Sequence, residues 1–420
     1  MPCCTTCFCI NLLVILVLKS DAVLPRIKPT RVAPCIAKAT RIIRPKSVSN
    51  QKGGSKMHRL TPENLFRAFS RPKHIKLLGD ERGDRAAIER VPIVTGFALT
   101  SASPVIINNQ LPRGNVWLGL RINLRGQLVG AGSASGTVLP DAPLSLFSLA
   151  LNTDLDGDII EPSISARALY RYAQFMHGTI EDLVAPTVTS STTTDFNAVV
   201  FIPFADPLLI NPVDSALDTR RYESIQLTIT SGVIGDIVSS PTNVTLGNLF
   251  ADVEIVRISP EVAPPQDLVQ LLPHYKRYAP IIPGTDTTLR LDRNPILAIK
   301  RLMAFASTGS TAGVPYTGTG SNGVIDTVSV ISDKRQHHGG PAGGVSFRTL
   351  RSANKLDYSI ETWPTGWHVI DWVLDGSINS SLPTGDKSNL DLVFTFQSTA
   401  STPQISVMQA AVRQLRELRA

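Results

Sequence analysis

The chain has 420 residues and a net charge of +7, from 41 Lys and Arg against 34 Asp and Glu. All five cysteines lie in the first 56 residues, which excludes a disulfide scaffold and a cysteine-ligated zinc site from the rest of the chain. Charged residues make up 18% of the chain and apolar residues 43%, a balance typical of a protein that buries surface in subunit contacts as well as in its core.

The leader, residues 1–56, carries the positive charge. It has ten Lys and Arg and one acid, a net charge of +9, so the remaining residues together carry −2. The apolar run at residues 8–18 is shorter than the roughly 20 residues that cross a bilayer, and no basic residue precedes it as in a signal peptide. Two interpretations stay open, a disordered basic arm and a start codon placed too early. The second, with Met57 as the true start, is favoured.

The following arm, residues 57–90, is predicted to hold short basic helical pieces. Pro72, Gly79 and Gly83 interrupt it, and its eight basic and five acidic residues give a net charge of +3. Such a segment suits the interior of an assembly or a partner surface, although a solvated helix fits equally well.

The first β-unit, residues 91–260, consists of short apolar runs separated by turn residues. Strands are predicted at residues 93–100, 115–124, 144–151, 198–203, 224–230 and 251–258. Several alternate between apolar and polar residues, as from Val116 to Leu124, which is the pattern of a half-buried strand. Residues 163–175 instead repeat apolar residues at helical spacing, so one helix is predicted within the unit.

A proline-rich linker is predicted at residues 261–288, before a second β-unit at 289–420 that ends in a C-terminal tail. Strands are predicted in this unit at residues 296–306, 324–332, 367–374, 390–397 and 404–412, with a helix at 349–356. The order of strands, one helix and further strands therefore occurs twice. This repetition predicts an all-β protein of two tandem jelly-roll β-sandwiches, each with a short inserted helix, preceded by an N-terminal arm.

Four stretches resemble a known family. They are GTVLPDAPLSLFSLAL at 136–151, SISARALYRYAQF at 163–175, DTRRYESIQLTI at 218–229 and GWHVIDWVLDGSINSSLPTGDKSNLDLVF at 366–394. Over residues 90–415 the chain resembles the double jelly-roll major capsid proteins, the viral coat proteins of tailless, membrane-containing icosahedral bacteriophages. The resemblance implies a trimeric capsomer of pseudo-hexagonal outline, with its strands standing upright on the shell.

The resemblance also implies a structural role rather than an enzymatic one, with no cofactor. The implied partners are two further copies of the chain in a homotrimer, neighbouring capsomers, minor capsid and vertex proteins, and an internal membrane, without specific nucleic-acid recognition. The protein would lie in the virion shell and assemble in the host cytoplasm. The loops at 187–195 and 308–322 would pack or project at the top of the capsomer.

The most distinctive local motif is a run of oxygen-bearing residues, Asn152, Asp154, Asp156 and Asp158. The oxygen ligands alternate and a glycine stands sixth, as in a calcium-binding loop. The twelfth position is Ser163, however, whereas a glutamate closes such a loop. An acidic surface turn is therefore favoured over a calcium site.

Other motifs give weaker indications. The GxGxxG run at residues 318–323 precedes a strand-like run where a dinucleotide site needs a helix, and no nucleophile, base and orienting group can be named. Trp363, Trp367 and Trp372 support the alternative function, a secreted β-sandwich module that binds carbohydrate. A core or interface role is favoured for these rings, because they lie in a strand-rich region.

Overall fold

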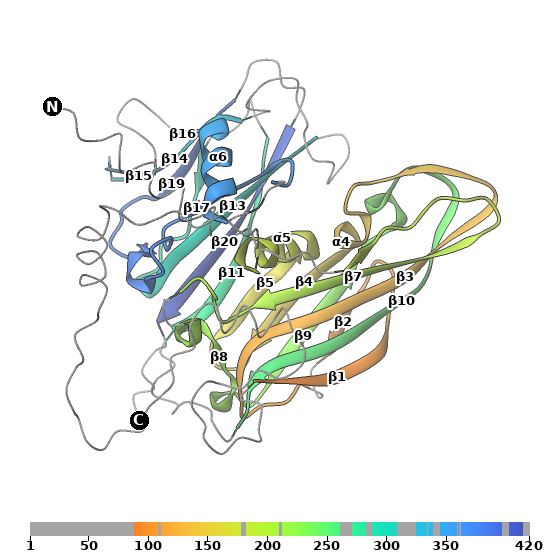
Figure 1. Cartoon of the computed structure of the whole chain (residues 1–420), viewed down its shortest axis with the longest axis horizontal. Helices are drawn as coiled ribbons and strands as arrows, with labels where there is room; N and C mark the ends of the chain where they lie inside the picture. Colours follow the sequence, from red (N-terminus) through yellow and green to blue (C-terminus); the bar gives the residue numbers. More distant parts are fainter. Residues whose placement is uncertain are drawn as a thin grey trace, which may run out of the picture. The chain divides into compact units, whose positions relative to one another are not determined.

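The computed structural model describes residues 88–107, 111–177, 182–209, 212–260, 271–282, 288–308, 325–333, 335–338, 345–358, 360, 363–396 and 403–414 (Figure 1). The leader, most of the 57–90 arm and nearly all of the 308–322 loop lie outside these residues. Within the described part of the chain, no helix has the length and apolar character that a bilayer span requires.

The first half of the described chain is built almost entirely of strands. They are β1 (Ile88–Leu99), β2 (Pro104–Ile107), β3 (Val116–Val138), β4 (Phe147–Thr153), β5 (Gly157–Ser165), β6 (Leu183–Val184), β7 (Thr193–Pro203), β8 (Leu217–Asp218), β9 (Ile225–Ser231) and β10 (Val238–Ile258). The helical elements are α4 (Ala142–Leu146), α5 (Ala166–His177) and the 3-10 turns η1 (Pro212–Ser215), η2 (Thr219–Arg221) and η3 (Ile234–Asp236).

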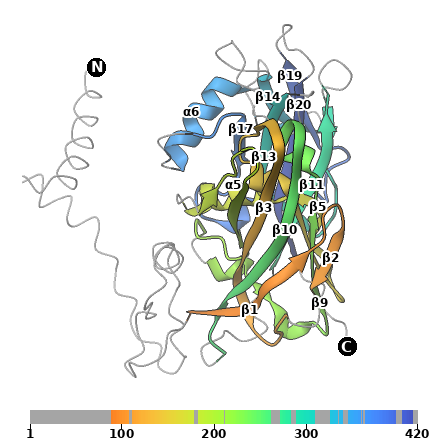
Figure 2. The ribbon, with the colours of Figure 1, turned by 90° about the vertical axis from the view of Figure 1, so that its right-hand side faces the viewer.

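The second half repeats this pattern with one α-helix. Its strands are β11 (Leu271–Ile281), β12 (Thr288–Arg290), β13 (Leu297–Thr308), β14 (Ile325–Ser332), β15 (Arg335–His338), β16 (Val345–Ser346), β17 (Trp367–Asp371), β18 (Leu382–Pro383), β19 (Asp391–Phe396) and β20 (Pro403–Gln414). The helical elements are α6 (Phe347–Asp357) and the 3-10 turn η5 (Ile378–Ser380). Figure 2 shows α6 beside β17.

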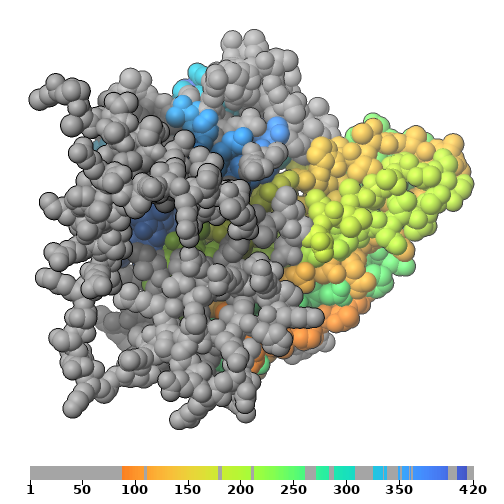
Figure 3. Space-filling view, in the orientation of Figure 1, coloured from red at the N-terminus to blue at the C-terminus, as the bar shows by residue number. Residues whose placement is uncertain are grey.

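The strands form three sheets. The six-stranded sheet has the order β1-β10-β3-β7-β6 with β8 on β3, the nine-stranded sheet β17-β13-β20-β11-β5-β4-β9-β2 with β18 on β13, and the five-stranded sheet β12-β19-β14-β15 with β16 on β14. The space-filling view shows β7, β3, β10 and β1 as neighbouring bands on one face (Figure 3). The nine-stranded sheet belongs to both halves, because β5 and β11 pair in parallel at Ile160 and Tyr275.

Side chains alternate along β3, so that one face of the strand is buried in the core and the other is partly exposed. Leu120, Ile122 and Leu124 are fully buried in the first core, whereas Arg121 and Asn123 between them are partly exposed. This is the period-2 pattern of a strand with one buried face. The predicted strand at 115–124 is confirmed, and it continues to Val138 because β10 pairs with it along nearly its whole length. The predicted all-β fold of two sandwiches is confirmed as well.

Two sequence-based boundaries need correction. Residues 271–281, predicted as part of a linker, form β11 in the middle of the nine-stranded sheet, where it pairs with β20. The pairing passes directly from Tyr278 to Ile281, so Pro280 falls in an irregularity where the missing proline N–H breaks no regular ladder. The strand predicted at 144–151 begins only at Phe147, because the short helix α4, with Pro143 in its first turn, occupies the residues before it.

The second-half part of the nine-stranded sheet is buried on both faces. On β13, Leu302, Ala304 and Ala306 belong to the core that faces the five-stranded sheet. The intervening residues Met303 and Phe305 belong to the core of the first sandwich. Since successive residues of a strand point to opposite faces, β13 joins the two cores.

Candidate functional site at the junction of the two sandwiches

A cluster of charged side chains is buried where the two halves meet. Asp206 follows β7, and its side chain accepts from Lys300 Nζ at 3.1 Å and from the Arg301 guanidinium. Arg301 Nε also donates to Asp371 Oδ2 at 2.6 Å. The side chains of Asp206 and Arg301 are 1% and 0% exposed. Charges at this depth are stable only when they are paired and hydrogen-bonded, so this cluster holds the first half to the second.

An irregularity in β13 brings two adjacent cations to one carboxylate. Neighbouring residues of a regular strand point to opposite faces, so Lys300 and Arg301 would normally diverge. The pairing of β13 with β20 passes from Ile299 to Arg301, which leaves Lys300 as an extra residue in the strand. Such a bulge redirects side chains, and here both cations reach Asp206.

The charges also set the ionisation of the cluster. Burial opposes ionisation of Asp206, but the charges of Arg301 and Lys300 outweigh it and hold its pKa well below the usual range. Burial would lower the pKa of Arg301, and the charges of Asp206 and Asp371 instead raise it well above its ordinary value. Asp206 and Arg301 are therefore both ionised at neutral pH.

Three tyrosines enclose these charges. Tyr358 donates its hydroxyl to Asp371 Oδ2 at 2.6 Å, and Tyr275 donates to the backbone oxygen of Pro203. Tyr172 of α5 lies edge-on to Tyr275, with ring centroids 5.5 Å apart. Burial, followed by nearby groups such as Asp371 and Asp206, raises the pKa of Tyr358 and Tyr275 well above 10. These hydroxyls remain protonated donors, which suits a structural network.

The predicted tryptophan platform lies inside the protein. Trp363 and Trp367 are 2% and 3% exposed. Trp363 stacks on Phe175 of α5, with centroids 4.5 Å apart, and Trp367 stacks on Phe305 at 4.6 Å. The carbohydrate-binding interpretation is wrong for this pair, since a ring that grips a sugar must be accessible; the core interpretation is confirmed. Trp372 is partly buried against the second core.

The structure brings the four candidate calcium ligands into one hairpin, with Asn152 near the end of β4, Asp154 and Asp156 in the turn, and Asp158 near the start of β5. Asn152 Nδ2 donates to Asp158 Oδ1 at 2.7 Å, and Tyr222 donates its hydroxyl to Asp156 Oδ2 at 2.7 Å. Asp154 accepts from the backbone N–H of Glu223 at 3.0 Å. Within the described residues no group of three or more His, Cys, Asp and Glu side chains has a metal-binding arrangement.

A cation from the second half already contacts this turn. The guanidinium of Arg413 on β20 donates to the backbone oxygens of Asp156 and Asp158 at 2.8 and 3.2 Å. These oxygens are of the kind that would face a bound metal in a calcium loop. The turn therefore makes a second polar contact between the two halves, in addition to the ion cluster around Asp206.

Sequence reasoning missed the residues that hold the junction. Two adjacent cations inside the apolar run of β13 are the one signal that pointed to it, since buried Lys and Arg demand partners. The GxGxxG run at residues 318–323 lies outside the described residues.

No protein-family model and no curated protein matches the sequence. Solved structures do match. The STIV MCP is 16% identical, with 80% of this chain and 100% of that chain covered and a TM-score of 0.58. A chain of the atomic structure of Sulfolobus turreted icosahedral virus is 15% identical, with 78% and 91% covered and a TM-score of 0.56. The major capsid protein P2 of bacteriophage PM2 is 10% identical, with 79% and 99% covered and a TM-score of 0.51.

The chain has the double jelly-roll fold. The resemblance predicted from the sequence is thus confirmed at the level of the fold. In the double jelly roll of this chain, the shared nine-stranded sheet, the buried ion cluster and α5 join the two rolls into one body. The two rolls are therefore joined by a shared sheet and by buried side-chain contacts.

Proposed function

We propose that the protein is a viral major capsid protein that self-assembles into an icosahedral shell. The observation that carries the proposal is that the two tandem jelly rolls of this chain align over nearly the whole length of solved capsid chains. One of those chains is the major capsid protein P2 of bacteriophage PM2, and another comes from an icosahedral virus. The role is structural rather than enzymatic.

The assembling unit is a homotrimer with a pseudo-hexagonal outline. Two similar rolls per chain give six similar blocks in a trimer, which suits packing with neighbouring capsomers. A rigid junction supports this role, because each block must keep a fixed angle to the next. The buried ion cluster and the shared sheet supply that rigidity.

Apolar side chains on edge strands support subunit contacts. Ile106 lies on β2, the last strand of the nine-stranded sheet, and Val184 lies on β6, the last strand of the six-stranded sheet. Both are about half exposed. Edge strands with exposed apolar residues readily pair with other chains unless they are covered. Further partners are minor capsid and vertex proteins and an internal membrane, in a virion shell assembled in the host cytoplasm.

Size-exclusion chromatography with light scattering tests the proposal on the purified chain. The expected mass is three times the mass of one chain, which is 45.4 kDa at full length. A stable monomer that stays monomeric at high concentration would overturn the proposed assembly. Intact mass spectrometry on the same sample gives the mass of one chain and so fixes the subunit count.

A further inference from the structure

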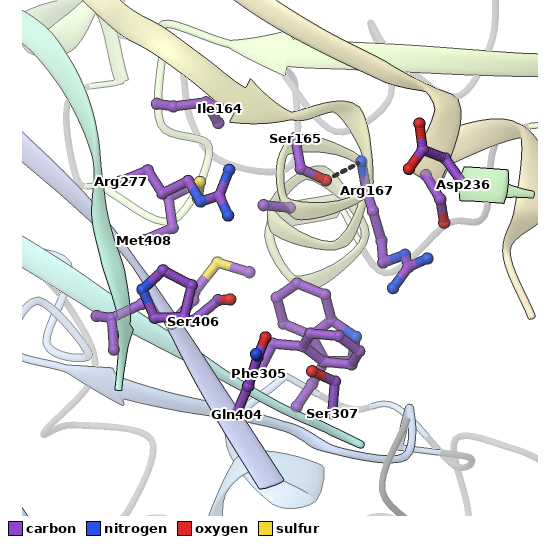
Figure 4. Close-up of a pocket in the computed structure, with 16 residues that line it drawn as sticks. Ile164, Ser165, Arg167, Asp236, Arg277, Phe305, Ser307, Gln404, Ser406 and Met408 are labelled. Atoms are coloured by element: carbon purple, nitrogen blue, oxygen red, sulfur yellow. Dashed lines mark hydrogen bonds between the residues drawn. The ribbon is translucent and has the colours of Figure 1, made fainter. Parts of the chain in front are cut away.

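A cavity of about 290 Å³ lies at the junction of the two rolls (Figure 4). Its first-roll wall comes from α4, the end of β5, the start of α5 and η3, and its second-roll wall comes from β11, β13, β17 and β20. The volume is at the lower end of the range of small-molecule sites. Neither the ion cluster around Asp206 nor the turn contacted by Arg413 lines it.

The polar wall of the cavity is rich in cations and hydroxyl groups. Figure 4 shows Arg277 on β11 and Arg167 on α5 on opposite sides of the pocket, with Ser165 between them. Arg277 is anchored by a 3.1 Å hydrogen bond from its guanidinium to the backbone oxygen of Ser163. A guanidinium group with nearby hydroxyl groups is suited to bind a carboxylate or another small anion.

A single carboxylate contributes to the described lining, that of Asp236, and its own turn engages it. Asp236 Oδ2 accepts from the backbone N–H of Val233 at 2.7 Å. Arg167 is 5% exposed, and burial lowers its pKa to about 10, which the charge of Asp141 offsets only in part. The cavity therefore presents more positive than negative charge.

The opposite wall is apolar. Met303 and Phe305 of β13, Trp367 of β17 and Met408 of β20 line it. The guanidinium of Arg167 lies over the Phe305 ring, 5.4 Å from its centroid, so the cationic and apolar walls meet at this ring. Methionine side chains adapt to ligands of varied shape.

We propose that this cavity binds a small amphiphile, a carboxylate joined to a short apolar body. The carboxylate contacts Arg277, and the apolar body packs on Phe305 and Met408. A medium-chain fatty acid such as octanoate has both parts, a carboxylate and a short apolar chain. Such a ligand contacts both rolls and stabilises their junction. The proposal holds for a single chain and does not depend on the capsid role.

Isothermal titration calorimetry of the purified full chain with octanoate tests the site. Arg277 is exposed, so Arg277→Gln removes one cation without disturbing the core. The matched control is Arg113→Gln, an exposed arginine outside the cavity. Octanoate is expected to bind once per chain and to raise the Tm. Its affinity is expected to fall about tenfold in Arg277→Gln and to stay unchanged in Arg113→Gln, since one charge-assisted contact is lost.

Two further titrants separate the parts of the ligand. Octan-1-ol keeps the apolar body without the charge, and sulfate keeps a charge without the apolar body. Each is expected to bind at least tenfold more weakly than octanoate. Equal affinity of either titrant and octanoate would overturn the proposed class of ligand. If octanoate does not bind at millimolar concentration, or if both arginine variants lose the same affinity for it, the proposed site is wrong.

Discussion

Arg301 in the second jelly roll forms a buried ion pair with Asp206 in the first, and it holds Asp371 on its other side. The pair bridges residues 95 positions apart in sequence. A bulge at Lys300 adds a second cation to the same carboxylate. A buried cluster of ionised side chains therefore contributes to the interface between the rolls.

Arg301→Met is expected to destabilise the protein strongly. The substitution keeps much of the side-chain volume but leaves Asp206 and Asp371 buried without their main partner. Removing one member of a buried ion pair costs about 3–5 kcal/mol. Urea unfolding followed by circular dichroism measures this loss as a shift of the midpoint.

The control for this variant is Arg125→Met. Arg125 pairs with Asp252 at 2.8 Å, but its side chain is 43% exposed. An exposed pair of this kind contributes at most about 1 kcal/mol. Equal losses in the two variants would show that the junction does not depend on its buried charges.

Stability is expected to fall between pH 6.5 and pH 4 because of His177. Burial lowers the pKa of His177 from 6.5 to about 4, and the charge of Asp206 offsets this only partly. The unfolded chain therefore takes up a proton below pH 6.5 that the folded chain refuses until about pH 4. The contribution of neutral His177 to the free energy of unfolding is complete above pH 6.5. It falls as the pH decreases, by about 2 kcal/mol at pH 5.

The variant His177→Gln separates this residue from the other titrating groups. Urea midpoints at pH 7, 6 and 5 should decline less steeply in His177→Gln than in the parent protein. The pH slopes of the unfolding free energy of the two proteins should differ by an amount that corresponds to nearly one bound proton. Parallel pH profiles would mean that His177 is not the group responsible.

Gly130→Ala is expected to disturb the loop that precedes β7. A Cβ atom at Gly130 would overlap the backbone oxygen of Thr189, and the Gly130 N–H donates to the backbone oxygen of Thr192 at 2.9 Å. Overpacking of this kind costs about 1–3 kcal/mol. The control is Gly235→Ala, where a Cβ atom meets nothing within 4 Å. Thermal unfolding should separate the two variants, and equal Tm values would contradict this packing.

The turn between β4 and β5 is expected to be stable without calcium. Asp154 and Asp156 accept hydrogen bonds within the protein, and Arg413 contacts the turn from the second roll. The Tm should be the same in excess Ca²⁺ and in excess chelator. A specific site saturated at 100 times its Kd would add about 2.7 kcal/mol, a rise of several degrees. A calcium-dependent rise that Asp156→Asn abolishes would show that the turn is a cation site.

The sequence predicted the regular strands well, because their side chains alternate along one buried face. The run from Val116 to Leu124 lies within its predicted range, and strand β9 extends one residue beyond its predicted end, to Ser231. Strands β5 and β11 were not predicted, because they contain Pro162, Pro273 and Pro280, and proline within a short segment usually indicates the end of a strand. Their pairing partners are remote in sequence, and this is what overrides the local signal.

The junction was beyond sequence reasoning for a related reason. Asp206 lies just beyond β7, whereas Lys300 and Arg301 lie on β13, and no local pattern joins these segments. The bulge that aligns the two cations depends on the register with β20. The tryptophan spacing was compatible with both a ligand-binding platform and a core position. The structure shows a core position, because Trp363 packs on α5 and Trp367 packs on β13.

Negative-stain electron microscopy of the expressed protein tests the central claim most directly. A double jelly-roll capsid subunit should appear as trimers of pseudo-hexagonal outline, with six similar lobes arising from three pairs of rolls. Class averages that contain only single two-lobed particles, at concentrations where chromatography also finds monomers, would contradict the proposed capsid function.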